Sequence, residues 1–133
     1  MTSAAQAPGV SSIGQIAINV QDLKRAVAFY RDKLGLRFLY EFPGLAFFDC
    51  GGVRLMMSRA EKPEFDHPAS IIYYKVPEIQ AASSALEAAG VTLEHQPTRI
   101  AEMPDHDLWM SFARDTEGNI FGLMSEVPRH STK

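Results

Sequence analysis

The chain contains the same pattern of residues twice, and this repeat limits the folds that it can form. In residues 14–36, apolar residues first alternate and then recur at helical spacing, which predicts a strand followed by an amphipathic helix. Residues 70–91 have the same order. Three apolar positions recur at an offset of 56 residues: Ile16, Val20 and Leu23 correspond to Ile72, Val76 and Ile79.

Each half continues with another predicted strand and closes on a hairpin. The first hairpin covers 47–58 and turns at Gly51-Gly52, and the second covers 111–125 and turns at 117–119. Each half therefore has the order β-α-β-β-β. A unit of about 60 residues buries too little surface to be stable alone, so we expect the halves to share one curved sheet.

These boundaries predict one domain, flanked by a leader and a tail that lack periodic apolar residues. The predicted division is a flexible leader (1–12), a domain (13–126) made of a first module (13–59), a linker (60–68) and a second module (69–126), and a tail (127–133). The first residues lack the basic and apolar regions of a secretory signal.

Composition excludes several classes of partner. The net charge is −3 and no run of Lys or Arg occurs, so we expect no binding to nucleic acid or to an anionic membrane. No apolar run approaches the roughly 20 residues that span a bilayer. Cys50 is the single cysteine, which excludes an internal disulfide. The simplest predicted location is the cytoplasm.

The second half is longer than the first. The offset between the halves grows from 56 at their starts to 66 at their ends, so about ten residues are inserted at 96–107. Because this stretch holds two prolines and polar residues, we expect a loop, with residues 97–108 covering a ligand as a lid. The alternative is an inert surface insertion.

Two motifs carry a resemblance to a known family. The stretch V-x-D-L-x-R-A-x-x-F-Y-x-x-x-L-G-L at 20–36 and R-D-x-E-G-N at 114–119, with the order of elements over 13–126, resemble the vicinal oxygen chelate superfamily. This family includes glyoxalases, bleomycin-resistance proteins and extradiol dioxygenases. The resemblance implies an α+β fold in which two βαβββ modules pair into a partly closed mixed β-barrel with flanking helices. The barrel interior would be the site.

The resemblance also implies four interior positions that supply metal ligands in metal-dependent members. In this sequence they are Gln15, Met56, Ile71 and Gly122. A divalent cation of this class prefers imidazole and carboxylate ligands, and only the Gln15 amide could ligate. We therefore expect no metal and no other cofactor.

Without a metal, the interior would be an apolar cavity with a few amides, suited to a flat organic molecule. Arg54 would face its mouth and pair with a ligand carboxylate. Trp109 and Met110 alternate, so one of the two would face the cavity. The candidate ligand-binding residues are Gln15, Ala17, Asn19, Arg54, Met56, Ile71, Met103, Trp109, Gly122 and Met124.

Three residues are candidates for acid–base catalysis. His106 and Asp107 lie where the long insertion enters a strand, and a histidine beside an acid can act as a general base near neutral pH. Tyr73 would face the cavity and relay a proton. The alternatives are that residues 104–107 form a turn and that Tyr73 is packing bulk.

We therefore predict a metal-independent protein, similar to bleomycin-resistance proteins, that binds a small organic molecule between its two modules. One alternative is an acid–base isomerase, lyase or hydrolase of a small carbonyl compound. Others are a sequestering resistance protein without turnover and a divalent-metal enzyme whose ligands lie elsewhere. Family members often bury sheet edges in a two-fold dimer, so a homodimer is expected.

Overall fold

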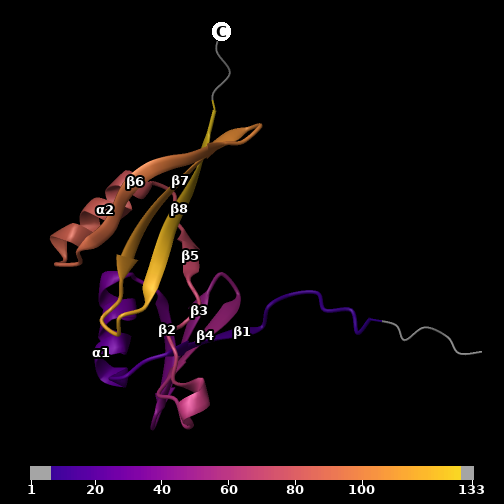
Figure 1. The fold of residues 1–133 in the computed structure, drawn as a ribbon, viewed down its shortest axis with the longest axis vertical. Coiled ribbons are helices and arrows are strands. Elements are labelled where there is room, and N and C mark those ends of the chain that lie inside the picture. Colours follow the sequence, from indigo (N-terminus) through magenta and orange to yellow (C-terminus); the bar gives the residue numbers. More distant parts are fainter. Residues whose placement is uncertain (1–6, 130–133) are drawn as a thin grey trace, which may run out of the picture.

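The computed structural model describes residues 7–129 (Figure 1). Residues 1–6 of the predicted leader and 130–133 of the predicted tail lie outside the described residues. The elements are β1 (Gln15–Asn19), α1 (Leu23–Ala28), η1 (Phe29–Lys33), β2 (Arg37–Phe42), β3 (Leu45–Cys50), β4 (Val53–Ser58), η2 (Pro63–Phe65), β5 (Ile72–Lys75), α2 (Ile79–Ala88), β6 (Leu93–Glu102), β7 (His106–Arg114) and β8 (Ile120–Pro128).

The strands form two four-stranded mixed sheets. Their orders are β1-β4-β3-β2 and β5-β8-β7-β6, so each half uses the same β-α-β-β-β topology. In each sheet the first and last strands of the half pair in parallel, and the other pairs are antiparallel. The predicted α+β fold of two βαβββ modules is confirmed. The two sheets do not close into a complete barrel.

The helices cover one face of the sheets and leave the other face free. In β1, Ile18 is buried in the core, whereas Gln15 and Ala17 are exposed on the opposite side. Both helices lie on the same side of the molecule (Figure 1). The strand alternation predicted for residues 15–20 is therefore confirmed, and the face turned away from the helices is called the open face of each sheet.

The β7–β8 turn joins the two modules. The Asp115 carboxylate accepts hydrogen bonds from the Tyr30 hydroxyl at 2.6 Å and from the Glu117 and Asn119 backbone N–H groups at 2.8 Å. Asn119 donates to the Asn19 carbonyl at 3.0 Å. We call residues 115–119 the clasp, because its side chains connect this turn to the first module.

Glu117 completes the clasp at the start of α1. Its carboxylate accepts from the Gln21 and Asp22 backbone N–H groups at 2.8 Å and pairs with Arg25 at 2.8 Å. Burial alone would raise the pKa of this carboxyl, but the hydrogen bonds from Arg25, Asp22, Thr116 and Gln21 lower it to about 2. The negative charge lies at the helix end where the dipole favours an anion.

The predicted loop in the second half is wrong, because the inserted residues lengthen a hairpin instead. β6 pairs with β7 along its whole length, and the turn is closed by the Met103 N–H donating to the His106 carbonyl at 2.8 Å. The inserted residues are shared between two paired strands, so their backbone N–H and C=O groups form hydrogen bonds with each other. Pro97 was one reason to expect a loop. It lies at a register shift in β6, an edge strand, where its missing N–H is tolerated.

The hairpin of β6 and β7 extends past α2 at one end of the molecule (Figure 1).

Within the described residues, no helix is long and apolar enough to cross a membrane.

Candidate functional site

A groove lies over one end of the open face of the first sheet. Its volume is about 990 Å³, and β1, β4, the β2–β3 turn and the linker line it. The floor is apolar because Ala17 and Met56 are register partners in β1 and β4. Phe65 from η2 adds an aromatic ring that is 52% exposed. Other lining residues include Asn19, Leu45, Ser58 and His67 and the charged residues Lys24, Glu41, Arg59 and Glu61.

Asn19 connects the linker to the groove. Its side-chain amide donates to the Asp66 carboxylate and the His67 carbonyl, both at 3.1 Å, which holds the linker beside β1. The amide oxygen is buried and has no hydrogen-bond partner among the described residues. A buried acceptor of this kind is costly unless a donor reaches it. A ligand hydroxyl or N–H would satisfy it.

Gln15 lies further along the same open face and is held by Arg54. The Arg54 Nε donates to the Gln15 Oε1 at 2.8 Å, and the Gln15 Nε2 lies 3.6 Å from the Met56 sulfur. The Arg54 guanidinium also lies 5.3 Å from the centre of the Phe47 ring. The amide oxygen of Gln15 is therefore engaged by a positively charged group.

The residues at the four metal-ligand positions do not fit a divalent cation. Gln15 and Met56 lie in the first sheet, whereas Gly122 lies in the second and Ile71 immediately precedes it. The one oxygen donor among them accepts from a guanidinium, and a thioether, an alkyl group and a glycine supply no hard ligand. Within residues 7–129, no group of three or more His, Cys, Asp or Glu side chains lies close enough to hold a metal ion.

On the open face of the second sheet, the Tyr73 ring covers the position that corresponds to the groove floor. Tyr73 and Gly122 are register partners, and a Cβ added to Gly122 would lie 2.8 Å from the Tyr73 ring. Phe112 packs edge-on against Tyr73, with ring centres 5.7 Å apart. Met124 lies on the same face. Gly122 is buried, so the expectation that it lines an open cavity is wrong.

The structure separates the three catalytic candidates. Asp107 does not face His106, since adjacent strand residues point to opposite sides. It lies 3.8 Å from Arg99 and 3.7 Å from Arg129 instead. The His106 Nδ1 is 2.7 Å from the carboxylate of Asp105, whose pKa this hydrogen bond lowers.

Tyr73 is also too far from His106 to act with it. Tyr73 is beside Gly122 in β8 and His106 is beside Pro128, six residues further along. At about 3.3 Å per residue this is a separation of about 20 Å. The predicted joint action of His106 with Tyr73 or Asp107 on one small substrate is therefore wrong within one chain.

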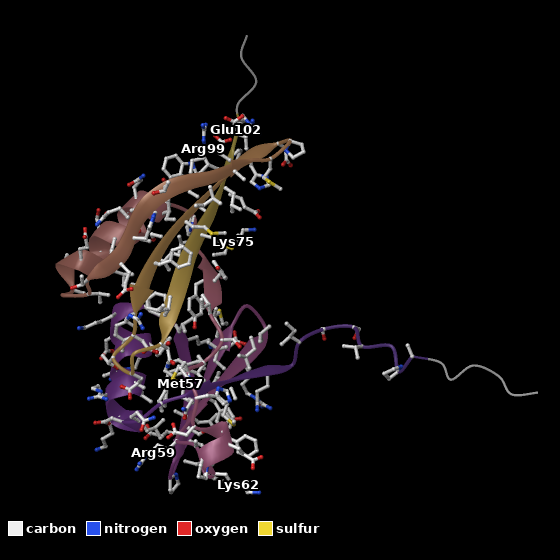
Figure 2. All side chains as sticks on the ribbon, in the orientation of Figure 1. Met57, Arg59, Lys62, Lys75, Arg99 and Glu102 are labelled. Carbon is white, nitrogen blue, oxygen red and sulfur yellow. The ribbon has the colours of Figure 1, made fainter. Side chains whose placement is uncertain are left out.

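The two ligand contacts predicted from the insertion do not reach the groove. Trp109 pairs with the buried Ser125 and packs against the core, so its side chain lies on the helix-covered face and Met110 lies on the open face. Met103 is in the turn between β6 and β7. Figure 2 shows Arg99 and Glu102 of this hairpin at the opposite end of the molecule from Arg59 and Lys62, which belong to the linker end.

Of the predicted ligand-binding residues, Ala17, Asn19 and Met56 line the groove. Gln15 and Arg54 lie beside it on the same open face, and Ile71 is 48% exposed. The catalytic candidate Tyr73 is 45% exposed. Sequence reasoning missed Leu45, Phe65 and His67. The signal for Phe65 was an aromatic residue within an otherwise polar linker.

The sequence model of the Glyoxalase/Bleomycin resistance protein/Dioxygenase superfamily matches residues 12–123. The chain belongs to this superfamily. The match covers both modules and confirms the resemblance seen in the two motifs. No curated protein matches the sequence closely enough to be a relative.

Solved structures of this superfamily fold are similar over most of the chain. A lactoylglutathione lyase from Agrobacterium tumefaciens is 25% identical, with 88% of this chain and 95% of that chain covered and a TM-score of 0.66. An antibiotic binding protein, TnmS3, from Streptomyces sp. CB03234 is 19% identical, with 89% and 98% covered and a TM-score of 0.73. A glyoxalase/bleomycin resistance protein/dioxygenase from Nocardioides is 19% identical, with 96% and 93% covered and a TM-score of 0.68.

Proposed function

We propose that this superfamily member binds a small organic molecule without a metal ion, in the groove on the open face of its first sheet. The observation that carries the proposal is the contact between Arg54 and Gln15. It puts a guanidinium on the one oxygen that a metal would need, beside a groove with an apolar floor. A groove of about 990 Å³ is at the upper end of the size range of sites for drug-sized ligands.

The similar structures include both a binding protein and an enzyme, the lactoylglutathione lyase. One of them, TnmS3, is an antibiotic binding protein, and binding without turnover needs only a shaped groove and a few hydrogen bonds. The groove offers these through Met56, Phe65 and the unpaired oxygen of Asn19. An isomerase, lyase or hydrolase using His106 with Tyr73 loses its geometric basis, because these residues are about 20 Å apart.

We also propose that the protein acts as a cytoplasmic homodimer of about 29 kDa, twice the chain mass of 14.7 kDa. Large apolar side chains on or beside the open faces of both sheets are exposed: Tyr40, Phe42, Ile71 and Tyr73. A monomer that exposes such side chains on both sheets has surface suited to a partner. A second copy covering these faces would leave the groove less accessible to water.

Metal analysis combined with ligand binding tests this proposal. Untagged protein should carry less than about a tenth of an equivalent of Zn, Ni, Fe or Mn, because the donor set lacks imidazole and carboxylate. A panel of apolar aromatic compounds should bind equally well before and after treatment with a chelator. Stoichiometric metal that is lost in the Gln15→Ala variant, together with ligand binding, would show instead a metal site with misassigned ligands.

A further inference from the structure

We propose that Arg54 is the subsite for the carboxylate of the bound molecule, so that the ligand is an organic acid with an apolar or aromatic body. This inference rests on the proposed function and adds the class of ligand. It follows from the position, the fixed orientation and the unused donors of one guanidinium.

The guanidinium is held in place by contacts that leave its outer edge free. Its Nε donates to Gln15 at 2.8 Å, and its plane lies near the Phe47 ring, 5.3 Å from the ring centre. Among the described residues, no carboxylate lies within ion-pair distance of Arg54, and the same holds for Arg37 and for the groove-lining Arg59, whereas five other arginines have acidic partners: Arg25, Arg31, Arg99, Arg114 and Arg129. The two terminal nitrogens are therefore available for a bidentate contact, which planar carboxylates match.

Two acids, Glu41 and Glu61, line the groove itself, and the acid that could compete for Arg54 is Asp49. It lies across from Arg54 in the β3–β4 register, at the end of the open face away from the groove. Its carboxylate makes no ion pair with Arg54 in the described structure. Its negative charge would therefore repel an anionic ligand without occupying the guanidinium. Removing this negative charge should strengthen the attraction of Arg54 for an anionic ligand.

The distance between Arg54 and the groove sets the size of the ligand. Arg54 and Met56 are two residues apart in β4, about 7 Å along the strand, and both face the open side. Met56 is the near edge of the groove floor. A carboxylate on Arg54 would therefore place a fused-ring body over Met56 and Ala17, with Phe47 and Tyr40 at its side. These two aromatic rings have centres 5.1 Å apart.

The test compares two probes that differ in charge and share one ring system, 2-naphthoate and 2-naphthamide, by isothermal titration calorimetry. Wild-type protein should bind the carboxylate at least about tenfold more tightly than the amide, since a charge-assisted bidentate pair exceeds a neutral contact. In Arg54→Gln this preference should fall to less than about twofold. Asp49→Asn should increase it.

Arg31→Gln is the matched control, because Arg31 is an exposed arginine paired with its neighbour Asp32. It should keep the wild-type preference. Equal binding of both probes to wild-type protein would overturn the carboxylate subsite and leave the proposed function standing. A preference that persists in Arg54→Gln would also overturn it, and binding of neither probe would count against both.

Discussion

The two modules share a topology but exchange large and small residues at one pair of positions. In the first module, Ala17 is the register partner of Met56, and in the second, Tyr73 is the partner of Gly122. The offsets of 56 and 66 residues make Ala17 equivalent to Tyr73 and Met56 equivalent to Gly122. A small residue on β1 leaves the first open face hollow, whereas the Tyr73 ring fills the space over Gly122. One swap therefore assigns the groove to one module.

The hairpin turns of the two modules also differ. The hairpin of the first module turns at Gly51-Gly52, and both residues have a positive φ. A turn of this kind needs only the conformational freedom of glycine. The equivalent turn in the second module is the clasp, which reaches the start of α1. At the start of α2, the N-cap residue Glu78 makes no side-chain hydrogen bond to the helix. The first module thus carries the groove, and the second carries the turn that connects the two modules.

The largest expected effect comes from removing the centre of the clasp. Asp115→Ala should lower the free energy of unfolding by about 3–5 kcal/mol, because it leaves the buried Tyr30 hydroxyl and two backbone N–H groups without partners. Urea denaturation at pH 7 measures it. The matched control is Asp49→Ala, the equivalent residue of the first module, which is half-buried and should cost less than about 1 kcal/mol. Equal losses would contradict the asymmetry.

A smaller effect is expected at Glu117, and it depends on pH. The pKa of this carboxyl is about 2 in the folded protein and 4.5 as the ordinary value, so the unfolded chain takes up a proton first as the pH falls. The stabilisation is complete above about pH 5 and is lost as the pH falls toward 2. Glu117→Gln should cost about 2 kcal/mol at pH 7 and only about a quarter of that at pH 2.5.

The measurement for Glu117 is the urea midpoint of both proteins across this pH range. The difference between wild type and Glu117→Gln should shrink steadily below pH 5. A difference that stays constant from pH 7 to pH 2.5 would show that the carboxyl contributes through packing and not through its charge.

The smallest effect concerns the filled open face. Gly122→Ala should cost about 1–2 kcal/mol, because the added Cβ would lie 2.8 Å from the Tyr73 ring and 3.1 Å from Phe112. In a Tyr73→Ala background the same change should cost less than half as much, and this double-mutant cycle isolates the contact. An unchanged cost in that background would assign the strain to Phe112 alone.

The repeat made most of the fold predictable. Alternation at Ile16, Ile18 and Val20 set the buried side of β1, and the two glycine-containing turns set both hairpins. The paired extension of β6 and β7 was not predictable, because Pro97 and the charged residues around it hide the alternation. The sequence also did not reveal that the clasp connects the second module to the first. Its motif was visible at 114–119, but its partners are about 90 residues away in sequence, as with Arg25 and Glu117.

The candidate site was predictable only in part. Residues on β1 and β4 were placed correctly on one face, because strand parity and the repeat both fix them. The linker contribution from Phe65 and His67 depends on the amide of Asn19 binding two groups of the linker, which no periodicity reveals. His106 and Tyr73 were grouped because both were expected near one cavity, and the long second hairpin separates them.

The clasp also sets an order of events during synthesis on the ribosome. The first module emerges before residues 115–121 have been translated, yet Phe29 packs against Phe121 and the Tyr30 hydroxyl binds Asp115. The nascent first module therefore lacks the partners of two aromatic side chains and the group that holds the first turn of α1. It cannot reach its native packing until the second hairpin leaves the exit tunnel, so nearly the whole domain is translated before either half is complete.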